Sequence, residues 1–189
     1  MNYIYKLLSL IYCRLLKCRN NIIIGKNVLI DYKTSILVRK NNNLIIKNGV
    51  TLSSIRKGYH AGMPFPTSLL VDGENALLEI GENSRLNGVY VHAQDKICIG
   101  KNCVIAAGVS IIDSNAHVLK SANRTQGRDV PKGIFIGNNV WIGLNSIILK
   151  GTEIGDNSVI SAGSIVKGKF SKNSLIQGNP AVMLSEIKI

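Results

Sequence analysis

The sequence predicts an all-β protein whose chain winds into a parallel β-helix. Three observations predict this fold: aliphatic residues return at every sixth position from residue 136 to residue 166, small residues follow four positions after most of them, and glycine and asparagine lie in between. A period of six matches neither an α-helix nor an alternating strand. It matches a chain that makes one short strand and one turn every six residues, in which glycine and asparagine supply positive φ.

The repeated aliphatic residues are expected to form the core of the coil. Three repeats close one triangular coil, so each aliphatic side chain points inward and stacks on its equivalent in the next coil, about 4.8 Å away. The register is expected to break at about 38–79 and 113–134. The strongest run contains Ile136, Ile142, Ile148, Ile154, Ile160 and Val166, and weaker runs contain Ile99, Ile105, Ile111, Ile80, Leu86, Ile24, Ile30 and Ile36.

The two ends of such a coil need caps, because their strand edges have no partner. Residues 1–20 carry apolar residues at helical spacing, which predicts a short amphipathic helix with a basic face. Charges interrupt this segment too often for it to span a bilayer. The helix is expected to cap the first coil or, alternatively, to lie on an anionic membrane surface. Residues 180–189 are the expected second cap, which leaves 21–179 as the β-helix domain.

Composition and charge narrow the classes of partner. The net charge is +12, and residues 1–60 hold eleven Lys and Arg against a single acid, Asp31. Such a segment favours an anionic partner, but no nucleic-acid-reading motif accompanies it, so we expect no nucleic acid. The four cysteines show neither CxxC spacing nor a following histidine. They predict reduced thiols in a cytoplasmic protein, and no metal site.

The repeat resembles that of the hexapeptide-repeat acyltransferases, whose fold is a left-handed parallel β-helix. The resemblance covers residues 20–184 in pieces and is dense from 99 to 184. Within this family, the segments DSNAH, WIGLNSIILKG and QGNPAVML are similar to those of the galactoside, maltose and capsular or O-antigen polysaccharide O-acetyltransferases. The resemblance implies a homotrimer with active sites between subunits, acetyl-CoA as acyl donor, and a glycan acceptor or its precursor that belongs to a capsule or other surface polysaccharide.

A loop that leaves the coil carries the expected catalytic base. Ile111 and Ile136 lie 25 residues apart, which is not a multiple of six, so the chain leaves the coil at about Asp113 and returns near Gly133. The resemblance implies that His117 in this loop is the general base. A sugar hydroxyl is a poor nucleophile, and an imidazole can take its proton near neutral pH. Asp113 is expected to orient the imidazole ring.

Trp141 is the only tryptophan, and it immediately precedes the inward-pointing Ile142, so its side chain should point outward. The resemblance places it in the cleft for donor and acceptor. Its corner of the prism differs from the corner of the His117 loop, so one pocket lined by both is easier to build between subunits.

The residues expected to contact acetyl-CoA are assigned by their position in the family motif. A backbone N–H at Gly143–Leu144 is the candidate donor to the thioester oxyanion. Lys167 and Lys169 stand in a segment where this chain departs from its relatives, and they are the candidates for phosphate contact. The complete set is Trp141, Gly143, Leu144, Ala162, Lys167, Gly168 and Lys169.

His92, His60 and Asn87 are the candidate acceptor contacts, and several other activities compete with sugar O-acetylation. A zinc-dependent carbonic anhydrase needs closely spaced histidines, whereas the three here lie 32 and 25 residues apart. Serine acetylation usually comes with a larger helical N-terminal domain. N-acetylation of an amino sugar or sugar nucleotide, and a non-enzymatic β-helical glycan-binding scaffold, remain as alternatives.

Overall fold

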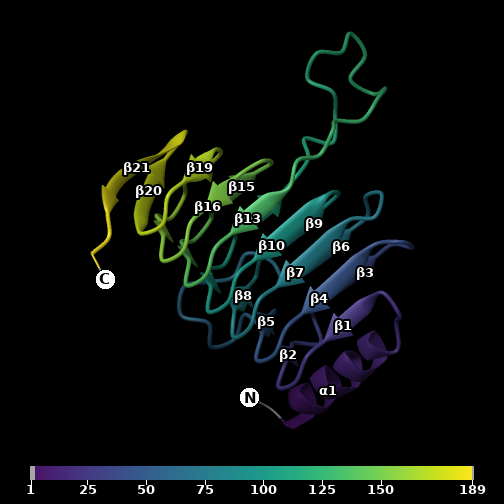
Figure 1. The fold of residues 1–189 in the computed structure, drawn as a ribbon. Helices are drawn as coiled ribbons and strands as arrows, with labels where there is room; N and C mark the ends of the chain where they lie inside the picture. The colour runs from purple at the N-terminus through teal and green to yellow at the C-terminus, as the bar shows by residue number, and fades with distance from the viewer. Residues whose placement is uncertain (1–2, 189) are drawn as a thin grey trace.

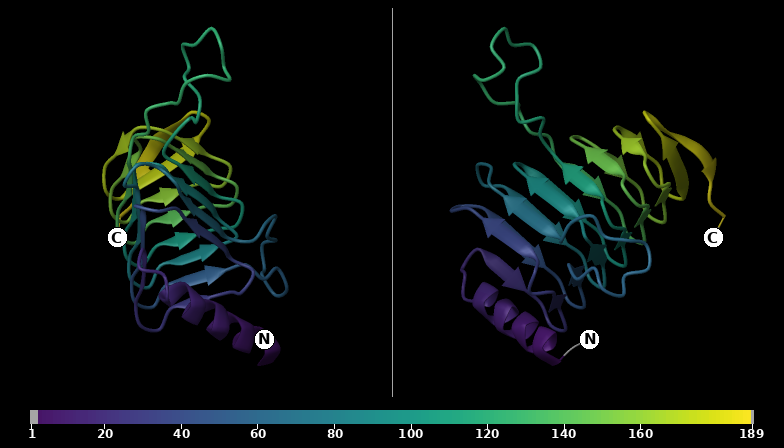
Figure 2. Two further views of the ribbon diagram at one scale, coloured as in Figure 1. Left: turned by 90° about the vertical axis from the view of Figure 1, so that its right-hand side faces the viewer. Right: turned by 180° about the vertical axis from the view of Figure 1, so that it is seen from behind.

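The computed structural model describes residues 3–188, and these form a left-handed parallel β-helix with one helix at its N-terminal end (Figure 1). Viewed along its axis, the coil is a three-sided prism from which two loops project (Figure 2). All strand pairs are parallel except the last one, between β20 and β21. The predicted fold is therefore confirmed.

Each side of the prism is one sheet, and successive strands pass from sheet A to sheet B to sheet C. Sheet A contains β1 (Ile22–Ile24), β4 (Asn43–Ile46), β7 (Leu77–Ile80), β10 (Lys96–Ile99), β13 (Ile134–Ile136), β16 (Glu153–Ile154) and β19 (Lys169–Phe170). Sheet B contains β2 (Leu29–Ile30), β5 (Thr51–Ser53), β8 (Arg85–Asn87), β11 (Val104–Ile105), β14 (Trp141–Ile142), β17 (Val159–Ile160), β20 (Ser174–Gly178) and β21 (Ala181–Glu186). Sheet C contains β3 (Ser35–Val38), β6 (Ser68–Val71), β9 (Tyr90–Ala93), β12 (Ser110–Ile112), β15 (Ile147–Leu149) and β18 (Ile165–Val166).

The repeated aliphatic residues fill the interior of the prism. Ile142 pairs with Ile160 of the next coil, and both side chains are buried. Burying such a side chain stabilises the fold by roughly 1.5–3 kcal/mol. All leads from Ile80 to Val166 are buried, whereas Ile24 and Ile36 in the first coil are half-buried.

The coil also continues through 38–79, where we had expected the register to break. Leu44 pairs with Leu78, and Leu52 pairs with Leu86, so strands of the same sheet still stack there. The spacing in these coils is wider than 18 residues because the turns are longer, and one loop, 54–67, is inserted. The six-residue period is lost there, but the three-sided geometry is kept.

Asparagine makes the turns between strands possible. Nine asparagines among residues 3–188 have positive φ, a backbone conformation that costs other L-residues roughly 1–2 kcal/mol. Some also stack from coil to coil, since Asn139 Nδ2 donates to Asn157 Oδ1 over 3.0 Å, and Asn157 Nδ2 donates to Asn173 Oδ1 over 3.1 Å. The turn residues therefore add a ladder of side-chain hydrogen bonds along one edge of the prism.

Helix α1 (Tyr3–Lys17) lies against the first coil, as the sequence predicts, but through an unexpected face. Leu16 is buried, Tyr12 packs on the core and donates to the Thr34 carbonyl over 2.7 Å, and Ser9 accepts from the Tyr32 N–H. The aliphatic stripe of the helix stays exposed and contains Ile4, Leu7, Leu8, Ile11 and Leu15. At the other end, the β20–β21 hairpin covers the last coil.

The two loops leave the coil at different corners. The loop 54–67 joins sheet B to sheet C, so it projects from the B–C corner. The loop 113–133 joins sheet C to sheet A and projects from the C–A corner, far beyond the body of the prism. These corners determine which candidate site residues can meet within one subunit.

Candidate active site

The loop 113–133 is fixed at its root and free at its tip. Across the root, the Lys132 N–H donates to the Asp113 carbonyl over 2.8 Å, and the Asp129 carboxylate accepts from the Asn115 N–H over 2.8 Å. The Lys150 ammonium forms an ion pair with the same carboxylate. These bonds hold the two arms of the root together beside the end of β15, so the loop leaves the coil in a defined direction.

His117 lies immediately beyond this fixed root. Its side chain is exposed, and only its backbone N–H has a hydrogen-bond partner among the contacts of the described residues, the Asn115 carbonyl at 2.7 Å. The preceding residue, Ala116, has φ of +61°, and within residues 3–188 it is the one positive-φ residue that is neither glycine nor asparagine. Such strain at a turn often accompanies a functional constraint. It redirects the chain just before the imidazole.

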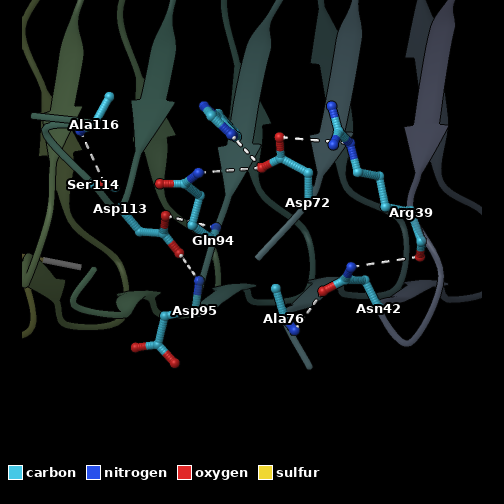
Figure 3. Close-up of polar contacts among 10 residues, drawn as sticks. Arg39, Asn42, Asp72, Ala76, Gln94, Asp95, Asp113, Ser114 and Ala116 are labelled. Atoms are coloured by element: carbon cyan, nitrogen blue, oxygen red, sulfur yellow. Dashed lines mark hydrogen bonds and ion pairs between the residues drawn. The ribbon is translucent and has the colours of Figure 1, made fainter. Parts of the chain in front are cut away.

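Asp113 lies at the base of the loop but does not contact the His117 ring. Its carboxyl is buried and accepts from the backbone N–H groups of Gln94 and Asp95, over 2.8 and 2.9 Å (Figure 3). Burial raises the pKa of Asp113, and the two N–H donors oppose that effect. The carboxyl is therefore committed to joining the loop root to the coil below, which is a positioning role.

Trp141 stands on the outer face of sheet B, as predicted, and its side chain is 54% exposed. It lies beside Val104 and Val159 of the neighbouring coils. A large exposed indole with aliphatic neighbours is suited to cover an apolar part of a ligand or of a second subunit.

Of the two residues predicted to offer a backbone N–H to the oxyanion, Gly143 uses its own N–H within the coil. That N–H donates to the Ile160 carbonyl over 2.8 Å, so it belongs to the coil and is not available to an oxyanion. A Cβ at Gly143 would approach the Ala162 N to 2.6 Å, which explains the glycine by packing. Within residues 3–188, the adjacent Leu144 N–H donates no hydrogen bond to another protein group, so it is the remaining candidate donor.

The donor-site candidates divide between two corners. Gly143, Leu144 and Ala162 lie in turns at the B–C corner, whereas Lys167, Gly168 and Lys169 lie at the C–A corner, two coils beyond the His117 loop. Lys169 Nζ is 2.7 Å from Glu153 Oε1, in an exposed ion pair that stabilises little. Within one subunit, Trp141 and Leu144 therefore lie at a different side of the prism from the His117 loop, as the repeat register predicted.

The acceptor-site candidates are also separated. His60 is exposed in the loop 54–67 and packs against Tyr59, while Asn87 donates to the Ile105 carbonyl over 3.1 Å at the B–C corner. His92 lies on sheet C, where its Nε2 is 2.7 Å from Asp72 Oδ1. Asp72 did not emerge from the sequence, because the long coils between β3 and β9 hide the register that brings it beside His92.

Residues 97–112 and 133–167 match the family model described as the hexapeptide repeat of succinyl-transferase. The chain is 30% identical over 114 residues to a putative lipopolysaccharide biosynthesis O-acetyl transferase of Escherichia coli, covering 56% of this chain and 58% of that protein. It is 37% identical over 128 residues to the galactoside O-acetyltransferase of the same organism, covering 61% and 63%. The chain thus spans about three fifths of these relatives.

Solved structures share the fold over most of the chain. A galactoside acetyltransferase in complex with coenzyme A superposes with a TM-score of 0.58 at 26% identity, covering 93% of this chain and 69% of that one. An N-acyltransferase from Bacillus cereus, in complex with dTDP and coenzyme A, gives a TM-score of 0.69 at 20% identity, covering 93% and 88%. The first of these structures is an acetyltransferase that holds coenzyme A. The second, at 20% identity, shows only that the fold is shared.

Proposed function

We propose that this chain, a member of the hexapeptide-repeat acetyltransferase family, transfers the acetyl group of acetyl-CoA to a hydroxyl of a sugar, with His117 as general base. The observation that carries the proposal is the geometry of the loop 113–133. A root fixed by Asp129 and Lys150 presents one exposed imidazole immediately beyond the body of the coil. An imidazole in that position can accept the proton of a hydroxyl near neutral pH.

The chemistry needs only a direct transfer. The acceptor oxygen attacks the thioester carbonyl while His117 takes the hydroxyl proton. The carbon–sulfur bond then breaks and the proton passes from His117 to the departing sulfur, so coenzyme A leaves as the thiol and no covalent enzyme intermediate is required. The Leu144 N–H is the proposed donor to the developing oxyanion, in place of Gly143. Trp141, Ala162 and Gly168 are proposed to line the donor site, and Lys167 and Lys169 to contact the coenzyme A phosphates.

The separation of these groups on one subunit supports a homotrimer with shared sites. His117 projects from the C–A corner, while Trp141 and Leu144 lie on sheet B and at the B–C corner. A neighbouring subunit that presents its sheet B to this loop completes one site. The same arrangement gives the free loop tip a surface to pack against.

The acceptor we propose is a surface polysaccharide or its precursor, and the experiment is an acetylation screen. Purified protein is incubated with acetyl-CoA and a panel of polysaccharides and monosaccharides, and release of the coenzyme A thiol is followed. Release that depends on a sugar and is lost in His117→Ala supports the proposal. No release above background with any sugar would contradict it.

N-acetylation of an amino sugar is the second candidate, and the product distinguishes the two. An O-acetyl ester is removed by mild alkali, whereas an N-acetyl amide survives it. An alkali-resistant product would show that the acceptor group is an amine and not a hydroxyl. A protein that binds the glycan without releasing coenzyme A would instead be the non-enzymatic scaffold.

We also place the enzyme in the cytoplasm, with α1 in peripheral contact with the inner face of the membrane. No helix within residues 3–188 is long and apolar enough to cross a membrane. However, α1 turns its aliphatic stripe away from the coil, with Leu7 49% and Leu15 64% exposed, and carries Arg14 and Lys17 in its last turn. Aliphatic and cationic side chains on one exposed helix suit an anionic lipid surface.

Vesicle sedimentation tests this contact. The protein should sediment with phosphatidylglycerol vesicles and remain in solution with phosphatidylcholine vesicles. Leu7→Glu combined with Ile11→Glu should abolish sedimentation, while Val182→Glu, an exposed apolar position at the opposite end of the coil, should not. Equal sedimentation of both variants would contradict a role for α1.

A further inference from the structure

The outer face of sheet C carries one polar interruption in a row of aliphatic side chains. Strand register aligns the outward residues at one level, and they read Leu37, Leu70, His92, Ile112 and Leu149 from coil to coil. Aliphatic residues are all that this face needs to pack. A histidine in the middle of the row is therefore unexplained by the fold.

This histidine is held by a carboxylate that is itself mostly covered. His92 Nε2 is 2.7 Å from Asp72 Oδ1, and the two side chains are 17% and 15% exposed. Gln94 Nε2 donates to the same oxygen over 3.4 Å, and Arg39 Nε lies 3.9 Å from the other oxygen (Figure 3). Withdrawing polar groups from water carries a cost that a packing role does not require.

The pair adjoins a groove of about 470 Å³ on the same face. Ser35, Ser68, Ser110 and Tyr90 line it from four successive strands of sheet C, with Lys33 and Phe65 at its rim. The Tyr90 ring lies 6.2 Å from the His92 ring, so the groove leads to the pair. Burial, and secondarily the Asp72 charge, raises the pKa of Tyr90, which keeps its phenol neutral.

The pair lies between this groove and the root of the loop that carries His117, because His92 is aligned with Ile112, the last residue before the loop, whereas Tyr90 and Ser110 at the start of their strands line the groove. The Asp113 carboxyl joins the loop root to Gln94, and Gln94 in turn contacts Asp72, so the pair lies one coil beneath the root (Figure 3). Lys33 supplies positive charge to the groove, and most of the remaining lining is hydroxyl or aromatic. Arg39 lies outside the groove, beside Asp72. Hydroxyls bond to sugar hydroxyls, an aromatic ring packs on a sugar face, and a lysine attracts an anion.

We propose that this groove is the acceptor site, that it takes an anionic sugar such as a uronic acid, and that His92 binds an acceptor hydroxyl while Asp72 positions the His92 ring. The inference rests on the proposed acetyltransferase function and adds to it the substrate class, the groove and roles for Lys33 and Asp72. Lys33 pairs with the acceptor's negative charge. His117 remains the group that takes the proton.

Acetylation kinetics with matched acceptors test the proposal. The probes are trigalacturonic acid, its methyl ester and maltotriose, with acetyl-CoA at saturation. The acid should have a KM about tenfold below that of its ester, and Lys33→Gln should remove this difference, which is the effect of losing one charge-assisted contact. Lys26→Gln, an exposed lysine of the same coil at another corner, should keep it.

The histidine and its carboxylate are tested by the split between KM and kcat. His92→Ala and Asp72→Asn should each raise the acceptor KM by about 10–100-fold and leave kcat and the acetyl-CoA KM within about threefold. Asp95→Asn, an exposed carboxylate in the turn after β9 that does not contact His92, is the matched control. Normal binding of coenzyme A shows that a variant is folded.

The outcomes separate this inference from the proposed function. Transfer to maltotriose with no preference for the acid, or unchanged acceptor KM in both variants, would overturn the acceptor site while leaving the acetyltransferase intact. A hundredfold loss of kcat in His92→Ala at saturating acceptor would overturn its binding role, because it would make His92 the base. Failure of every acceptor to release coenzyme A would instead overturn the proposed function.

Discussion

The two loops that leave the coil differ in what holds them. The loop 54–67 returns onto its own body: Ser54 and Thr67 are buried at its ends, and Met63 is buried over Gly88, whose missing side chain leaves room for it. The loop 113–133 is bonded to the coil only at its root (Figure 2), and beyond the root it exposes Leu119, at 69%. The first is a wall of the subunit, and the second lacks a partner within it.

This difference indicates where each loop acts. A loop that packs on its own coil can shape a site in one subunit, and the loop 54–67 contributes Phe65 to the groove on sheet C. A loop with an unpacked tip gains a fixed geometry only against another surface. We therefore expect His117 to act at a donor site on a neighbouring subunit, and the two loops should respond differently to substitution.

The largest expected effect is on catalysis by the free loop. His117→Ala should lower kcat by about 10²–10⁴-fold, because it removes the proposed general base. Acetyl-CoA binding and assembly should be unchanged, since the exposed ring supports no core. Steady-state kinetics with titration of coenzyme A checks both, and Ser121→Ala in the same loop is the control. A variant that keeps more than a tenth of the wild-type kcat would show that His117 is not the base.

Stability should respond in the opposite way. Met63→Ala in the packed loop should destabilise the protein by about 2–5 kcal/mol, the usual effect of emptying a buried methionine site. Leu119→Ala in the free loop should change the free energy of unfolding by less than about 0.5 kcal/mol. Urea unfolding of the separated subunit measures both. Similar losses in the two variants would mean that the loops do not differ in packing.

The lysines at the donor end should have a smaller effect. Lys167→Ala combined with Lys169→Ala is expected to weaken coenzyme A binding by up to about fivefold, the scale of exposed charge pairs. The loss should be smaller for dephosphorylated coenzyme A. Glu153→Gln, which frees Lys169 from its ion pair, should strengthen binding slightly. Calorimetry that finds equal losses for both ligands would remove the phosphate-contact role.

The smallest effect concerns the root of the free loop at acidic pH. The Lys150 hydrogen bond, helped by the Asn115 N–H, lowers the pKa of Asp129. Because its folded pKa is lowered, its contribution to stability is present above the usual aspartate value of about 3.9 and is lost as pH falls through the folded value. Hydrogen exchange of the Asn115 amide should lose protection in that range. Lys150→Met should move the loss to higher pH, and an unmoved profile would contradict the assignment.

Much of the coil could be predicted from the sequence, because from residue 99 onward each aliphatic lead occupies the same place in every coil. The period itself determines which side chains are buried, and the six repeated aliphatic residues from Ile136 to Val166 all lie in the core. The position of the loop 113–133 also follows, since a break in a strict period has a definite start and end. Trp141 is exposed for the same reason.

The remaining features depend on geometry that a period does not encode. The α1 helix turns Tyr5, Ser9 and Tyr12 to the coil because short polar and aromatic side chains meet the first turn there, so its aliphatic stripe is left outside. The pairing of Asp72 with His92 was hidden because Leu70 and His92 are 22 residues apart yet adjacent in the sheet. Which of Gly143 and Leu144 has a free N–H could not be predicted either, because it depends on the coil itself using the Gly143 group.

The most direct test of the shared site is complementation between two inactive variants. His117→Ala and Trp141→Glu each spoil one half of every site, and they are unfolded together, mixed in equal amounts and refolded. If one subunit supplies His117 and its neighbour supplies Trp141, random assembly restores about a quarter of the sites in a cyclic oligomer. We expect recovery of about a quarter of wild-type activity. Activity no higher than that of the separate variants would contradict a site built between subunits.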